Sequence, residues 1–148
     1  MDSNPKIWKY ISKQLFLAKN NPEETIYQKT ITDIFTDQDL LGWPEELVIR
    51  EYGIKMGSTK KCDIVLLDST KTPFIAIEVK LANSPSDGVE QLGSYMDRCT
   101  PRLKYGITIK DSINLFYDED TGHSIHSEND AIFSVSFDNS DSNGEEFV

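Results

Sequence analysis

Apolar positions recur at helical spacing early in the chain and at strand spacing after it. A first helix is predicted to begin near Pro5, because Ser3 or Asn4 can cap it and apolar residues follow three or four positions apart. A second helix is predicted to begin at Pro22, with Asn21 as its cap. The expected buried face of this second helix consists of Ile26, Tyr27, Thr30, Ile31 and Ile34.

Short apolar runs separated by turn residues predict strands in the rest of the chain. The predicted strands span residues 47–54, 62–68, 73–80, 103–110, 112–118 and 131–137. Turns are predicted at residues 40–47, 56–61, 69–73 and 110–112. One further helix, from about Asp87 to Cys99, is predicted to turn Val89, Leu92 and Met96 inward. This order predicts an α/β or α+β fold with a mixed central sheet flanked by helices.

The length of 148 residues allows one domain with a substantial core and is short for two. We therefore expect a single domain over residues 1–137 and an acidic flexible tail over residues 138–148. No apolar run approaches the roughly 18 residues of a membrane helix, and the N-terminal residues lack the pattern of a signal peptide. Cys62 and Cys99 have no metal-ligand spacing, which is typical of reduced thiols and predicts a cytoplasmic protein with no membrane partner.

The net charge of −10 at first disfavours a nucleic-acid partner, because such proteins usually have a basic face. The acidity is concentrated, however, since residues 118–148 hold nine acidic and no basic side chains. Residues 1–117 therefore carry 16 acidic and 15 basic residues, for a net charge of −1. DNA binding by the body of the chain is compatible with this distribution.

The strand predicted over residues 73–80 ends in two charged residues that share one face. Burying Glu78 and Lys80 there would be costly unless another group compensates their charges. Asp63 lies near the start of the preceding strand, so neighbouring strands can bring its carboxylate close to that of Glu78. Two close carboxylates repel each other unless they are protonated or bridged by a cation such as Mg²⁺. Such an ion lowers the pKa of a bound water, and Lys80 could then orient this water for phosphodiester hydrolysis.

The segment Glu78-Val79-Lys80 on an apolar strand, preceded by Asp63, resembles the PD-(D/E)XK nuclease superfamily, whose restriction-endonuclease-like fold has a mixed central sheet. The proline that usually precedes the Asp is replaced by Cys62. One branch, the N-terminal nuclease domain of type I restriction enzyme R subunits, resembles more of the chain. Its resemblance covers "NPEETIYQ", "GWPEELVIREYGIK", "KKCDIVLLD", "PFIAIEVKLAN" and "VEQLGSY", in the same order. This implies a nuclease core over residues 21–117, with an extra C-terminal strand at about residues 131–137.

The resemblance also implies roles for individual residues. Asp63, Glu78 and the Val79 carbonyl would hold the metal, and Lys80 would position or activate the attacking water. Gln91 and Tyr95 resemble a family element that contacts DNA or supports the site, and they share one helix face. The acid that the family has on the helix before the sheet would be Glu23, because Glu24 is better placed to cap that helix. Tyr27 stands where the family often has an arginine.

The function implied is that of a Mg²⁺-dependent DNA endonuclease, with Mn²⁺ as a substitute metal. DNA would be its substrate, a helicase or another protein its partner, and a homodimer would supply two sites for cutting both strands. Taken singly, each site residue also fits an ordinary structural role, such as an exposed ion pair at a strand end. Two other functions therefore stay open: a catalytically inactive nuclease-fold module that binds nucleic acid or protein, and an interaction protein acting through residues 118–148. His123 and His126 are interpreted as loop residues, because nothing nearby completes a zinc set.

Overall fold

The computed structural model describes residues 24–39, 41–56, 58–81, 84–99, 102–118, 125 and 127–136. The predicted first helix, the cap of the second and the acidic tail lie outside these residues, as do His123 and His126. Among the helices of this described part, none is long and apolar enough to span a membrane.

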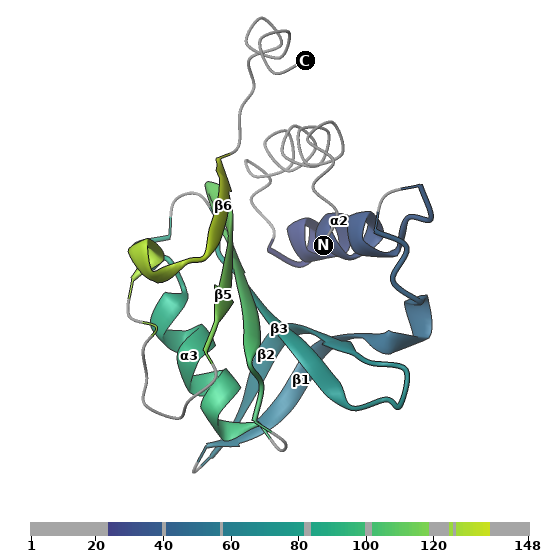
Figure 1. The fold of residues 1–148 in the computed structure, drawn as a ribbon, viewed down its shortest axis with the longest axis horizontal. Coiled ribbons are helices and arrows are strands. Elements are labelled where there is room, and N and C mark those ends of the chain that lie inside the picture. The colour runs from purple at the N-terminus through teal and green to yellow at the C-terminus, as the bar shows by residue number, and fades with distance from the viewer. Residues whose placement is uncertain are drawn as a thin grey trace, which may run out of the picture.

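In the described residues, a six-stranded sheet forms the centre of the fold, with the α-helices α2 and α3 and two short 3₁₀ helices around it (Figure 1). The helices are α2 (Glu24–Thr36), η1 (Glu45–Leu47), α3 (Val89–Arg98) and η2 (Glu128–Asp130). The strands are β1 (Val48–Met56), β2 (Ser58–Leu67), β3 (Pro73–Val79), β4 (Tyr105–Ile109), β5 (Ser112–Tyr117) and β6 (Phe133–Ser136). The described strands lie in chain order in the sheet, and among them β3 and β4 are the pair that runs parallel. This confirms the predicted fold class, an α+β restriction-endonuclease-like fold with a mixed sheet.

The two α-helices pack on opposite faces of the sheet (Figure 1). On one face, α3 places the predicted Val89, Leu92 and Met96 in the core, together with Tyr95. On the other face, α2 buries Ile31 and Ile34, as predicted, and also Phe35 and Gln28. Both faces of the central strands are therefore covered, which explains why β3 is a continuous apolar run rather than an alternating one. 

The parallel pair of β3 and β4 requires a crossover, and α3 supplies it. The helix lies so close to β4 that a Cβ placed on Gly106 would meet Met96 Sδ at 2.6 Å and Leu92 Cδ2 at 2.8 Å. Gly106 is therefore a packing glycine, which lets the helix rest on the backbone of the strand. 

Several predicted boundaries differ from the structure, among them those of the first hairpin and of the last strand. The turn predicted at residues 56–61 is wrong in its extent, because β1 and β2 pair up to Met56 and Ser58. Pairing extends this far because each added residue satisfies backbone groups that a longer turn would leave to water. The last strand begins at Phe133 rather than at residue 131, and the Phe133 side chain is exposed. In the described structure β6 ends the order of strands and pairs only with β5, which accounts for its weak burial.

Arg102 joins the C-terminal end of α3 to the end of β5. Its Nε and Nη2 lie 2.9 and 2.8 Å from Asp97 Oδ1. The same Nη2 is 3.2 Å from Asp118 Oδ2, and Nη1 donates to the Asp118 carbonyl at 2.6 Å. The three side chains are 16%, 11% and 5% exposed, in the order Arg102, Asp97 and Asp118. This ion-pair network fixes the helix that lies beside the candidate site.

Candidate active site

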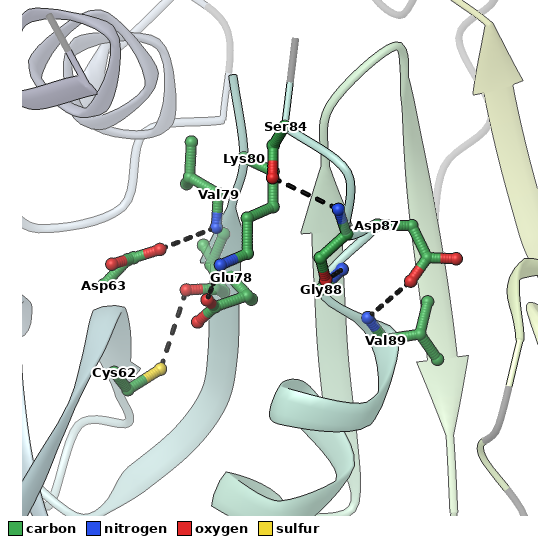
Figure 2. A network of polar contacts seen from close by, with 11 residues as sticks. Cys62, Asp63, Glu78, Val79, Lys80, Ser84, Asp87, Gly88 and Val89 are labelled. Carbon is green, nitrogen blue, oxygen red and sulfur yellow. Dashed lines mark hydrogen bonds and ion pairs between the residues drawn. The ribbon is translucent and has the colours of Figure 1, made fainter. Parts of the chain in front are cut away.

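Asp63 lies in the middle of β2, where that strand passes the C-terminal end of β3. The antiparallel ladder pairs Ile64 with Ile77, so Asp63, which precedes Ile64, lies opposite Glu78, which follows Ile77. One residue further along β3, the Val79 N–H donates to Asp63 Oδ2 at 2.8 Å (Figure 2). Beyond the last backbone pair of the two strands, this hydrogen bond to a side chain links β2 to β3. It holds the Asp63 carboxylate beside the end of β3.

The end of β3 has not emerged into water. Glu78 is 3% exposed, and Lys80 Nζ lies 3.5 Å from Glu78 Oε2 (Figure 2). The Lys80 N–H donates to the Ile109 carbonyl at 2.9 Å, so the backbone stays attached to β4 beyond the last strand residue. A carboxylate buried to this degree requires a compensating cation, and the Lys80 ammonium provides one. 

The negative charge of this site raises the pKa values of both Tyr95 and Cys62. Burial, and then the charge of Glu78, raises the pKa of the Tyr95 phenol well above its ordinary value. Burial also raises the pKa of the Cys62 thiol, with further contributions from Glu78 and Asp63. The Cys62 thiol is free, as predicted, and it is buried, with its sulfur 3.5 Å from the Ile64 carbonyl and 3.6 Å from the Ile77 carbonyl, either of which can accept its proton. Tyr95 and Cys62 therefore stay neutral beside the carboxylates at physiological pH.

Gly88 is a site neighbour that the sequence analysis missed. It precedes α3 with φ of +82°, and a Cβ placed on it would lie 2.9 Å from Glu78 Cγ and 3.4 Å from Lys80 Cγ. The available signal was a glycine at the start of the helix predicted from about Asp87, because glycine adopts positive φ more readily than other residues. That signal predicts an unusual backbone, but it does not indicate which side chains lie against it.

The other predicted site residues are less closely tied to the carboxylates. Gln91 is exposed on α3, one turn before Tyr95, and its role stays a prediction. Glu23 lies outside the described residues. In β1, Glu51 has a φ of +57° and sits between the residues that pair with Ile64 and Cys62. Its charge also raises the pKa of Tyr95, so a third acid lies near the site.

The two facing carboxylates of Asp63 and Glu78 are donors of the kind that a hard cation takes. In the described residues, no three His, Cys, Asp or Glu side chains form a metal-binding group. Two carboxylates fit the usual protein share of a Mg²⁺ site, because this ion takes one or two carboxylates and keeps several waters. A structural Zn²⁺ site would need four protein ligands, rich in Cys and His.

Comparison with known proteins gives one family. A family model described as the N terminus of the type I restriction enzyme R protein matches residues 22–132, which is most of the chain. The matched range contains the predicted site residues Glu23, Asp63, Glu78, Lys80, Gln91 and Tyr95. Searches of curated proteins and of solved structures gave no match.

Proposed function

Since this chain belongs to the type I restriction enzyme R protein N-terminal family, we propose that it is a Mg²⁺-dependent DNA endonuclease. The family supports a nuclease with a role in restriction and modification. The observation that carries the proposal is that Asp63 and Glu78 face each other where β2 passes the end of β3, with Lys80 Nζ 3.5 Å from Glu78 Oε2. Two acids and a lysine in this arrangement are suited to hydrolysing a phosphodiester.

Asp63, Glu78 and the Val79 carbonyl would hold the metal, and Glu23 would assist directly or through a water. The hydrogen bond from the Val79 N–H to Asp63 Oδ2 keeps that carboxylate from turning away from the end of β3. When bound, Mg²⁺ would lower the pKa of a water and neutralise the charge that develops on the phosphate. Mn²⁺ would serve as a substitute.

Lys80 would orient the attacking water and stabilise the charge of the reacting phosphate. Its ammonium is held near Glu78, so its position is set before DNA binds. The water oxygen forms a bond to phosphorus as the bond to the leaving oxygen breaks, and the proton of the water passes to solvent. Tyr95 stays a neutral phenol that supports the carboxylates, and the exposed Gln91 would contact the DNA backbone.

We further propose that a helicase or another protein partner delivers the DNA to this site. A homodimer would place two such sites on the two strands of a duplex. Measuring the molar mass of the protein with and without DNA distinguishes a monomer from a dimer at the moment of cutting.

The proposal is tested by incubating supercoiled, linear and branched DNA with Mg²⁺ or Mn²⁺. Wild type should cut at least one substrate, while Asp63→Asn and Lys80→Met should each lower the rate by about a hundredfold or more. Asp39→Asn and Lys104→Met are matched controls, because both residues are exposed outside the site, and they should cut like wild type. 

Two outcomes would reject the proposal. Cutting that survives both site substitutions would mean that the activity belongs to another site or to a contaminant. No cutting on any substrate, together with no rise in melting temperature on adding metal, would favour the inactive binding module. In that case, loss of a binding partner on removing residues 138–148 would indicate an interaction protein that acts through its acidic end.

A further inference from the structure

Gly88 touches both charged residues at the end of β3. A Cβ on Gly88 would lie 2.9 Å from Glu78 Cγ and within 3.6 Å of two carbons of Lys80. The contact atom of Glu78 is in the middle of its side chain, so the clash could not be relieved by moving only the carboxylate. The aliphatic carbons of Glu78 and Lys80 therefore pack close to the backbone of Gly88, and Figure 2 shows the three residues beside one another.

The segment that carries Gly88 is held by a series of local hydrogen bonds between residues two apart. Ser86 N–H donates to Ser84 Oγ, Gly88 N–H to Ser86 Oγ at 3.0 Å, and Val89 N–H to Asp87 Oδ1 at 3.0 Å (Figure 2). These side chains satisfy backbone groups before the first turn of α3. The segment therefore has a defined shape rather than resting only on its contact with β3.

Lys110, which follows β4, attaches the start of this segment to the sheet. Its Nζ donates to the Ser84 carbonyl at 2.7 Å, and its backbone N–H closes the turn between β4 and β5. Because β4 pairs with β3 up to Val79 and Ile109, the lysine projects from the strand end next to the candidate site. Lys110 thus connects the segment to the same pair of strands that carries Glu78.

We propose that residues 84–88 are a positioning element for the Glu78–Lys80 pair, with Gly88 setting the spacing and Lys110 holding the segment in place. This inference rests on the proposed metal-dependent nuclease. Side chains that are confined before the metal arrives lose less freedom on binding it, so the element raises metal affinity as well as activity. Gly88 and Lys110 are positioning residues, since they act through Glu78 and Lys80.

The first test compares Gly88→Ala with Gly42→Ala. Both glycines have positive φ, +82° and +62°, so alanine strains the backbone at either position. At Gly42, however, the nearest atoms to an added Cβ are 3.8 Å away, and they belong to Gln38. Mn²⁺ affinity is measured without DNA by titration calorimetry. Gly88→Ala should weaken it by about tenfold or more, whereas Gly42→Ala should match wild type.

The second test replaces Lys110 and leaves both glycines intact. Lys110→Met should weaken Mn²⁺ binding without DNA, Lys110→Arg should restore most of it, and Lys104→Met should have no effect. If Lys110→Met raises only the KM for DNA, the lysine contacts DNA and the inference is wrong. If Lys110→Met lowers the melting temperature but leaves the Mn²⁺ affinity unchanged, Lys110 only stabilises the fold. That result would also overturn the inference.

The outcomes separate this inference from the proposed function. If wild type cuts DNA and Gly88→Ala binds Mn²⁺ and cuts equally well, the positioning element is refuted and the nuclease stands. If wild type binds Mn²⁺ but never cuts, the nuclease is refuted, and the affinities of the variants still decide the positioning role. If wild type does not bind Mn²⁺, both are refuted.

Discussion

Replacing Arg102 by methionine should destabilise the protein strongly, because its guanidinium is shared by the buried carboxylate of Asp118 and the mostly buried one of Asp97. The substitution keeps an unbranched apolar stem of similar reach and removes the charge. It thereby breaks the contacts with Asp97 Oδ1 at 2.8 Å and Asp118 Oδ2 at 3.2 Å. It also leaves the Asp118 carbonyl without the 2.6 Å hydrogen bond from Nη1.

The size of the effect follows from the burial of the network. Removing one partner from a buried ion pair costs about 3–5 kcal/mol, because the remaining charge stays desolvated. The side chains of Arg102 and Asp97 are 16% and 11% exposed, so water can reach part of the network and the lower end applies. We expect a loss of about 3 kcal/mol in the free energy of unfolding, or about 10 °C in melting temperature.

Urea unfolding monitored by circular dichroism measures this loss, and Lys29→Met is the matched control. Lys29 Nζ lies 3.1 Å from Asp33 Oδ2, but the two side chains are 67% and 63% exposed. Such a pair along a helix contributes about 0.5 kcal/mol or less. If Arg102→Met lowers the free energy of unfolding by no more than Lys29→Met does, the network does not hold α3 against the sheet. The argument from burial would then fail.

Two further predictions concern packing and pH. Gly106→Ala should cost about 1–3 kcal/mol through overpacking against Met96 and Leu92, whereas Gly93→Ala, whose nearest contact would be 3.6 Å, should be neutral or stabilising; equal melting temperatures would contradict this. The pKa of Cys62 is raised in the folded state, so the stability that comes from its neutral thiol is complete below about pH 9.0 and is lost as pH rises further. Urea titrations at pH 8 to 10 should show this fall, and an equal fall in Cys62→Ala would assign it to other groups.

Much of the candidate site was visible in the sequence because it is encoded locally. Glu78 and Lys80 share a face since side chains alternate along a strand, and both lie where predicted. Tyr95 was placed on the helix after that strand, and the structure buries it where it senses the charge of Glu78. The role of Asp63 depends on pairing between strands, which sequence order suggested but could not fix.

What the sequence could not supply were contacts made across the fold. The Val79 N–H that anchors Asp63 becomes available only because β2 and β3 pair in one particular register. Gly88 fell at the start of the helix predicted from about Asp87, and Lys110 in the turn predicted at residues 110–112. Their relation to Glu78 depends on how the segment before α3 returns to the sheet.

The sequence by itself determined which segments become strands and helices, and which face of α3 is apolar. Those properties follow from the spacing of apolar residues, which each segment carries independently. Only the tertiary structure decided the parallel pairing of β3 with β4, the length of the first hairpin and the neighbours of Glu78. The physical reason is that register and close packing are settled jointly by several segments, so no single stretch of residues encodes them.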